Sequence, residues 1–435
     1  MVYLLLFLAI LCAIVPFYAL AVSPLILLYP AFLFMAIQNR SLHCIELLIW
    51  AGILATFEYL PIIDALIYMA PDNSLLALIP GTLLILSTAS YSMCWLFFSQ
   101  KYITHRPLSN QLIVWTMSLF LYLIIKDQLY LFCNPLLPLS YYPRLAAPLC
   151  AVPQWIALLW FAGFTSAVAW LFAAPGKLTA LALLVITIPW IIITQPPACQ
   201  PPWLNTIGHL PITIAANASL EASSALLAHE LCLLKQQFPR LTTVILPESA
   251  WNSTNLSQTP VLALLQQNPI PNFFIGSFLT NQEKCYNTVY QYHKGRLMSK
   301  SSKRHLLPLT EQPIPLPLCQ NLYFEKSSPI SCCQESKPLI TLSNPALTAV
   351  IYICSELFFN TTPDDPYQCP IIAVTNDWWF RMAHFCRLMA NAARLRAMQW
   401  KRPIIYVSYK HAYYFDTAGK CYPLITCSQS RLFNF

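Results

Sequence analysis

Apolar runs long enough to cross a bilayer recur through the first 195 residues, and they restrict what this chain can fold into. A helix needs roughly 20 mostly apolar residues to cross the hydrocarbon core. Of all residues 57% are hydrophobic and only 10% are charged, and the apolar excess lies in this half. The pattern predicts a transmembrane helical domain over residues 1–195 with about seven spans. The predicted spans are 2–15, 19–37, 43–62, 76–99, 111–126, 153–173 and 177–195.

The charges in the short loops indicate an orientation for these helices. Lys and Arg accumulate in cytoplasmic loops. With the N-terminus inside, the inner loops carry Arg40, Lys101, Arg106 and Lys177, and the outer loops carry Asp64, Asp72, Lys126 and Arg144. This modest bias predicts that the C-terminal domain lies on the outer face of the membrane. If the host is a Gram-negative bacterium, the protein is then a multi-pass protein of the inner membrane with this domain in the periplasm.

The second half of the chain reads as a globular α/β domain. A Pro-rich linker, residues 196–208, precedes it, and the domain itself is predicted over residues 209–435. Apolar strand-like segments alternate with two helical segments, which is typical of a layered α/β fold. The chain has only 8 Gly and contains neither a P-loop nor a GxGxxG motif. Nucleotide use is therefore not expected, and no cofactor is predicted.

Three potentially reactive residues each follow a predicted strand. Glu248 lies in "VILPESAWN", Lys303 in "SSKRHLLPL" and Cys354 in "IYICSELFF". A cysteine nucleophile needs a base and a group that stabilises negative charge, and these roles suit a carboxylate and an ammonium group. The alternative for Cys354 is a small core residue, which is what most strand cysteines are.

Taken in this order, these segments resemble the nitrilase superfamily, and within it the apolipoprotein N-acyltransferases. The matching segments are "LPESAW", "NTVYQYHKG", "KRHLLPLTEQPIPL", "NDWWF" and "ARLRAMQWKRPII". The resemblance spans residues 205–420 and implies a nitrilase-type α-β-β-α sandwich after a multi-span helical domain. The apolipoprotein N-acyltransferases also have several membrane helices before this domain, as is predicted for this chain.

The resemblance also implies a mechanism. Cys354 would take an acyl chain from a phospholipid as a thioester, and an amine, such as that of a lipoprotein, would then accept the chain. Glu248 would be the base and Lys303 the oxyanion partner. The implied supporting residues are Glu311, Glu356, Asn376 and Trp379.

Several positions depart from the family pattern. Ser355 replaces the Tyr of C-Y-E, and Arg381 replaces a Gly. Leu388 and Met389 replace a Q-H pair, and residues 408–411 replace T-N-N-G. A final membrane helix is not found, which resembles the shorter relatives encoded with conjugal-transfer systems and makes conjugation machinery a candidate partner. Two alternatives to the acyltransferase stay open: an amidase or thioesterase that uses water, and a non-catalytic envelope or transfer protein.

The remaining signals concern binding partners. The densest basic run, residues 294–305, lacks the context of a nucleic-acid site, so no nucleic-acid partner is predicted. Contact with anionic lipid headgroups or simple solvation are the two interpretations of this run. The 16 cysteines suit an oxidising compartment, but none of their spacings indicates a zinc site, so no metal is predicted.

Overall fold

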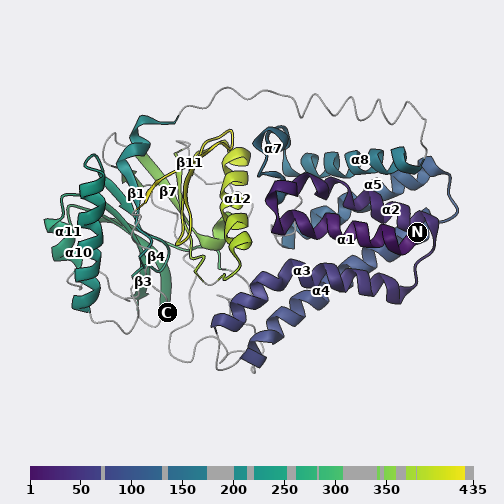
Figure 1. The fold of residues 1–435 in the computed structure, drawn as a ribbon, viewed down its shortest axis with the longest axis horizontal. Coiled ribbons are helices and arrows are strands. Elements are labelled where there is room, and N and C mark those ends of the chain that lie inside the picture. Colours follow the sequence, from purple (N-terminus) through teal and green to yellow (C-terminus); the bar gives the residue numbers. More distant parts are fainter. Residues whose placement is uncertain are drawn as a thin grey trace. The chain divides into compact units, whose positions relative to one another are not determined.

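The computed structural model describes residues 1–69, 74–129, 136–173, 200–212, 220–251, 261–281, 284–306, 340–342, 347–358, 369–378 and 380–426. The chain divides into two compact units (Figure 1). The first unit comprises Met1–Pro196 and Phe380–Gln399, and the second comprises Pro197–Trp379 and Trp400–Phe435. The boundaries predicted from the sequence, at residues 195 and 209, stay predictions.

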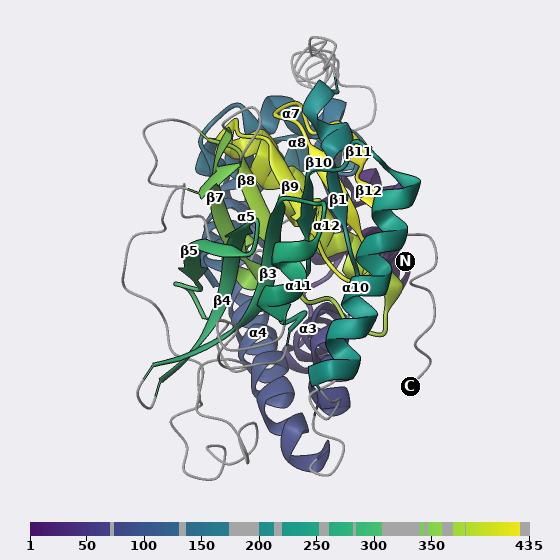
Figure 2. The same ribbon diagram turned by 90° about the vertical axis from the view of Figure 1, so that its left-hand side faces the viewer.

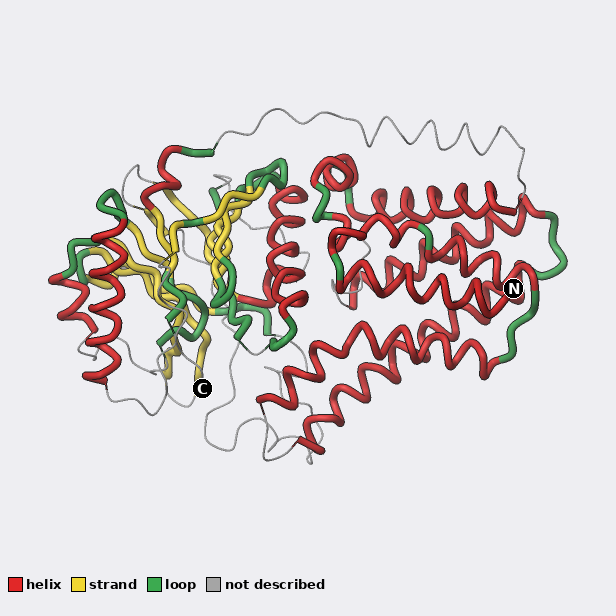
Figure 3. Tube along the Cα trace, viewed as in Figure 1, coloured by secondary structure: helices red, strands yellow, loops and turns green. Residues whose placement is uncertain are grey.

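The first unit contains the apolar helices, which Figure 3 draws in red. Their bounds are α1 (Val2–Tyr18), η1 (Leu20–Leu27), α2 (Tyr29–Asn39), α3 (Cys44–Met69), α4 (Ser74–Ile103), α5 (Leu108–Leu129), α6 (Leu136–Leu139), α7 (Pro143–Cys150) and α8 (Gln154–Ala173). The first turn of the chain toward η1 has a local cause. Pro16 lies inside the end of α1, where its ring cannot continue the hydrogen-bond ladder.

Five segments of the described residues are long and apolar enough to cross a membrane. They are Leu20–Asn39, Cys44–Ala65, Gly81–Ile103, Leu108–Ile125 and Gln154–Ala173. Seven spans were predicted. The first of these corresponds to α1, whose 17 residues make it a shorter apolar helix. The last, 177–195, lies outside the described residues.

Hydroxyl groups connect these helices, and large apolar side chains face outward. Thr116 in α5 donates a hydrogen bond to Ser166 in α8 at 2.7 Å, and Tyr91 in α4 donates to the main-chain oxygen of Tyr122 in α5 at 3.1 Å. Such bonds satisfy polar groups that a hydrocarbon environment would leave without partners. The exposed side chains include Ile49, Leu86, Ile113, Leu121 and Phe172. This distribution suits helices that face lipid.

The second unit is built on two six-stranded sheets. The first has the order β12-β1-β2-β3-β4-β5 and the second the order β11-β10-β9-β8-β7-β6. The strands of the first are β1 (Ile207–His209), β2 (Thr243–Ile245), β3 (Asn272–Asn281), β4 (Lys284–His293), β5 (Arg296–Ser302) and β12 (Ile425–Thr426). Those of the second are β6 (Ile340–Leu342), β7 (Leu347–Ile353), β8 (Ile371–Val374), β9 (Ile404–Val407), β10 (Ala412–Phe415) and β11 (Cys421–Pro423).

Each sheet has parallel strands beside an antiparallel part. In the first sheet β12, β1, β2 and β3 are parallel, and β3, β4 and β5 form an antiparallel meander that Figure 2 shows side by side. In the second sheet β7, β8 and β9 are parallel. Strands β8 and β9 are continuous runs of buried residues, as expected of parallel strands covered on both faces.

Two apolar cores hold these layers together. Helices α10 (Leu220–Gln237) and α11 (Val261–Gln267) cover the outer face of the first sheet, where Leu227, Leu231 and Leu265 pack against Val244 and Phe273. The second core joins the sheets face to face. It includes Ile245 and Phe274 from the first sheet and Ile351, Ile372 and Ile405 from the second.

The connection from β8 to β9 passes through α12 (Ala383–Trp400), because parallel neighbours need a crossover of this kind. Residues up to Gln399 group with the first unit. The predicted fold class, apolar helices followed by an α/β sandwich domain, is confirmed.

A buried histidine makes the first sheet sensitive to acid. His209 at the end of β1 is 2% exposed, and burial lowers its pKa from 6.5 to about 3 against a smaller opposing effect of the Ser408 main chain. Between about pH 3 and pH 6.5 His209 therefore binds a proton in the unfolded chain but not in the folded chain. Proton binding favours the unfolded state, so the stability of the domain decreases as the pH falls below 6.5.

We expect this group to cost the domain about 2 kcal/mol of unfolding free energy between pH 7 and pH 5. Hydrogen exchange of the β1 and β2 amides in the detergent-solubilised chain, corrected for intrinsic rates, measures this change. His209→Met should remove that part of the pH dependence. An unchanged pH dependence in the variant would show that His209 is not the group responsible.

Candidate active site

Glu248 follows β2 and is held by groups from three other segments. Its side chain is buried, and Oε1 accepts a hydrogen bond from Asn287 Nδ2 in β4. Oε2 accepts one from the main-chain N–H of Asn376 at 2.7 Å. The main-chain oxygen of Glu248 accepts a third from the Tyr409 hydroxyl at 3.1 Å. A buried carboxylate needs such donors, because its desolvation is otherwise costly.

The turn that carries Glu248 is strained and closely packed. Ser249 has a φ of 55°, a conformation that costs a residue other than Gly roughly 1–2 kcal/mol. Gly276 of β3 lies against the same turn. A Cβ on Gly276 would lie 2.3 Å from the Pro247 oxygen and 2.7 Å from the Glu248 Cα. Only a glycine therefore lets β3 approach this closely.

Lys303 follows β5 and faces Glu248. Its Nζ lies 3.8 Å from Glu248 Oε1, and neither side chain is more than 5% exposed. The main-chain N–H of Lys303 donates to the Asn287 oxygen at 2.8 Å. Burial of an ammonium group requires a partner of opposite charge. The pair therefore places a positive and a negative group together at the end of the first sheet.

Cys354 lies immediately after β7, at the first position of the short helix η6 (Cys354–Leu357). Its φ is 50°, in the left-handed region. It is only partly buried, whereas Ile351 and Ile353 before it are completely buried. Cys354 therefore combines a strained turn and partial exposure with packing against the core that joins the two sheets, so the nucleophile and core interpretations both stay open.

The carboxylate of Glu356 joins the turns that carry Lys303 and Cys354. Oε1 accepts a hydrogen bond from the main-chain N–H of Arg304 at 2.9 Å, and Oε2 accepts one from that of Ile353 at 2.7 Å. Arg304 adjoins Lys303, and Ile353 adjoins Cys354. One buried side chain thus ties the end of β5 in one sheet to the end of β7 in the other.

Asp377 continues the network beyond Asn376. Its buried carboxylate accepts hydrogen bonds from Ser408 Oγ at 2.7 Å and from the Lys410 N–H at 3.2 Å. Burial is the largest influence on this carboxyl group and raises its pKa, against the effect of these donors. Asn376 Oδ1 accepts a bond from the Trp378 N–H at 3.1 Å.

The predicted site residues fall into three groups. Glu248 and Lys303 contact each other, and Glu248 contacts the main chain of Asn376. Glu356 connects the turns of Lys303 and Cys354. Glu311 and Trp379 lie outside the described residues. Among the residues that the structure describes, no three His, Cys, Asp or Glu side chains form a group that could hold a metal ion.

Sequence reasoning assigned no role to three residues that contact Glu248. Asn287 and Tyr409 donate hydrogen bonds to it, and Gly276 makes room for its turn. The sequence gives one indication for Asn287, which is a polar residue at the start of the strand-like segment "NTVYQYHKG". Tyr409 stands in one of the segments noted as departures from the family pattern, which gave no indication of its contact.

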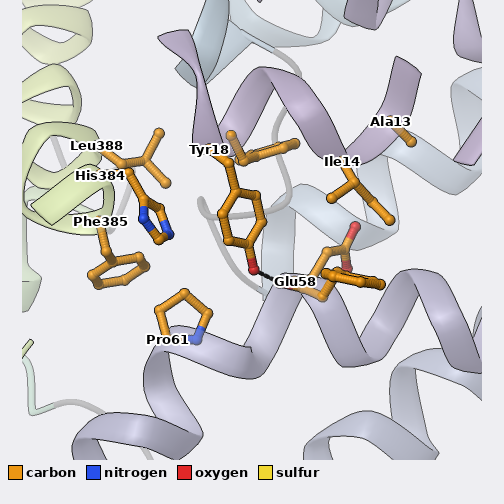
Figure 4. A pocket seen from close by; sticks show the side chains of 10 residues that line it. Ala13, Ile14, Tyr18, Glu58, Pro61, His384, Phe385 and Leu388 are labelled. Atoms are coloured by element: carbon orange, nitrogen blue, oxygen red, sulfur yellow. Dashed lines mark hydrogen bonds between the residues drawn. The ribbon is translucent and has the colours of Figure 1, made fainter. Parts of the chain in front are cut away.

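A small pocket lies elsewhere, within the first unit. Figure 4 shows Tyr18 of α1 beside His384 of α12, with ring centroids 4.3 Å apart, and the Tyr18 hydroxyl donates to the Phe57 oxygen of α3. Apolar side chains such as Ile14 and Leu388 complete the lining. The cavity is about 20 Å³, room for one water molecule. This volume is too small for an acyl chain.

Comparison with known proteins concerns the α/β half of the chain. No protein-family model and no curated protein matches. The carbon-nitrogen hydrolase of Helicobacter pylori G27 is similar at 11% identity and a TM-score of 0.36, over 49% of this chain and 82% of its own. An amidase of the nitrilase superfamily from Nesterenkonia AN1 is similar at 10% identity and 0.34, over 50% and 84%. Saccharomyces cerevisiae Nit3, of branch 10 of that superfamily, is similar at 18% identity and 0.33, over 49% and 81%.

Substitution of Gly276 tests the close approach of β3 to Glu248. Gly276→Ala should destabilise the domain by about 1–3 kcal/mol, because the added Cβ meets main-chain atoms that cannot move aside. Gly208→Ala is the matched control, since its Cβ would meet the flexible Leu241 side chain. Hydrogen exchange of the β2 and β3 amides measures both. If Gly276→Ala and Gly208→Ala lowered the free energy of unfolding equally, the proposed difference between main-chain and side-chain contacts would be wrong.

Substitution of Glu356 tests the connection between the two sheets. Glu356→Gln replaces one of two acceptor oxygens by an amide group. The main-chain N–H groups bonded to that oxygen lose their acceptor, which should cost about 1–3 kcal/mol. Glu221→Gln, on the exposed start of α10, should change stability by less than about 0.5 kcal/mol. Protection of the Arg304 and Ile353 amides reports which bond is lost. Unchanged protection of both would contradict the bridge.

Proposed function

We propose that this chain is a membrane-embedded acyltransferase of the nitrilase type, in which Cys354 carries the acyl chain as a thioester. One observation carries the proposal. The Glu356 carboxylate holds the Arg304 and Ile353 amides, so that the turns of Lys303 and Cys354 are joined, while Lys303 is paired with Glu248. A thiol nucleophile, a carboxylate base and an ammonium group beside the oxyanion together supply the roles that thiol acyl transfer requires.

The proposed first step moves an acyl chain from a phospholipid to the enzyme. The Cys354 sulfur attacks the ester carbonyl carbon, and Glu248 accepts the thiol proton. Lys303 stabilises the oxyanion that forms. As the ester C–O bond breaks, the proton passes to the leaving alcohol, and a lysophospholipid departs. The left-handed turn at Cys354 and its partial exposure suit a nucleophile that must reach a substrate.

The proposed second step returns the enzyme to its starting state. An amine, such as the N-terminal amine of a lipoprotein, attacks the thioester carbonyl. An amide C–N bond forms, the C–S bond breaks, and the amine's proton returns to the Cys354 sulfur through Glu248. Asn287 and Asn376 hold the Glu248 carboxylate in place for both proton transfers.

The helices of the first unit account for the choice of a lipid substrate. Within the described residues, five apolar segments are long enough to cross a bilayer, and such an anchor would keep the α/β domain close to lipid. An amidase that acts on soluble compounds has no need of such an anchor. We place the domain on the periplasmic side, following the loop charges of the sequence.

The test is the intact mass of the chain purified with bacterial phospholipid. We expect an acyl-sized increase that neutral hydroxylamine removes and that is absent from Cys354→Ala. Cys421→Ala is the matched control, because this cysteine is also partly exposed, and it should retain the adduct. Addition of a peptide with a free amine should discharge the adduct and give an acylated peptide.

The other results each point elsewhere. An adduct that water discharges as fast as the amine does would indicate a thioesterase or amidase. Absence of any Cys354-dependent adduct would overturn the proposal and leave a non-catalytic membrane protein with this fold. An adduct that is lost equally in Cys421→Ala would show that Cys354 is not its specific site.

A further inference from the structure

The corner that connects β9 to β10, residues 408–411, lies against the turn of Glu248. The corner closes on itself, since the Ser408 N–H donates to the His411 oxygen at 2.8 Å and the His411 N–H donates back to Ser408 Oγ at 2.9 Å. This is one of the segments that departs from the family pattern quoted above.

Tyr409 reaches from this corner to the main chain of Glu248. Its hydroxyl donates to the Glu248 oxygen at 3.1 Å, and the bond is buried. The Trp378 ring packs edge-on against the Tyr409 ring, with centroids 6.2 Å apart. The tyrosine is thus held on one side by an aromatic ring and on the other by the turn that carries the carboxylate.

Ser408 and Lys410 restrain the side chain of Glu248, through two intermediate residues. Both donate to the Asp377 carboxylate, which is completely buried. Asp377 follows Asn376, and the Asn376 N–H donates to Glu248 Oε2. The corner therefore restrains Asn376 through Asp377, and Asn376 restrains the carboxylate itself.

The geometry points to the 408–411 corner as a positioning device for Glu248. Tyr409 fixes the main chain of Glu248, and Ser408 with Lys410 fixes its carboxylate through Asp377 and Asn376. The turn needs this support, because Ser249 is held at a φ of 55° that the chain would relieve if it were free. The inference rests on the proposed function, in which Glu248 is the base.

The experiment measures Cys354-dependent release of p-nitrophenol from p-nitrophenyl butyrate by the full-length chain in detergent. Tyr409→Phe should lower kcat about fivefold, the factor that one ordinary hydrogen bond supplies, with KM unchanged. Tyr290→Phe is the matched control. Its hydroxyl donates to the Phe278 oxygen at the same 3.1 Å, so it removes a partly buried bond of the same kind and length that does not involve Glu248.

Ser408→Ala provides a second measurement that a purely structural role would not change. Without the Ser408 hydroxyl, Asp377 restrains Asn376 less, so the bond from the Asn376 N–H to Glu248 becomes weaker. A weaker bond stabilises the Glu248 carboxylate less and so raises the pKa of Glu248. The acidic limb of the kcat/KM profile should therefore move to higher pH. Ser299→Ala is the control. It removes a hydroxyl of β5 that donates to the Gln291 side chain of β4 at 2.8 Å, and it should leave the acidic limb of the kcat/KM profile unchanged.

Each result decides the question. If Tyr409→Phe and Ser408→Ala match their controls while wild-type chain turns over the ester, the positioning role is overturned and the proposed function stands. If both variants only lower the unfolding temperature, with kcat and the acidic limb unchanged, the corner is structural and the inference also fails. If wild type shows no Cys354-dependent release, the proposed function and the inference built on it both fail.

Discussion

The carboxylate of Glu356 is the contact on which the arrangement of the candidate site depends. It accepts main-chain N–H groups from Arg304 and Ile353, which belong to turns at the ends of different sheets. Apolar packing between the two sheets removes side chains from water, but the hydrophobic effect itself has no preferred direction. Hydrogen bonds to a buried carboxylate do have direction, so they determine where Cys354 lies with respect to the turn of Lys303.

The Glu248 side of the site illustrates how strain and support occur together. Ser249 and Cys354 are both in the left-handed region, at φ values of 55° and 50°. Such residues persist only where the surroundings restrain them. Around Ser249 the restraints are the close approach of Gly276 and the bonds from Asn376 and Tyr409 to Glu248. Around Cys354 the restraint is the bond between Glu356 and Ile353.

Much of the fold could be predicted from the sequence, because periodicity and hydrophobicity are local properties. The segments "TTVIL", "PNFFIGSFL", "CPIIAV" and "RPIIYV" form strands, and the helix after residue 219 is present. The apolar segment "LPITIAAN", residues 210–217, also predicts a strand, but the observed strand ends at His209, and residues 213–217 lie outside the described part of the chain. Val2–Tyr18 is shorter than a span, and it ends where Ala19 leaves the helical conformation.

The sequence by itself determined that apolar helices precede an α/β domain and that Glu248, Lys303 and Cys354 each follow a strand, since these facts depend on neighbours along the chain. Only the tertiary structure decided that Glu248 lies 3.8 Å from Lys303 and that Glu356 joins the turns of Lys303 and Cys354. It alone decided that Tyr409 supports Glu248 from 161 residues away. Contacts between residues so distant in sequence depend on the pairing order of strands in two sheets and on how those sheets pack, which no local pattern encodes.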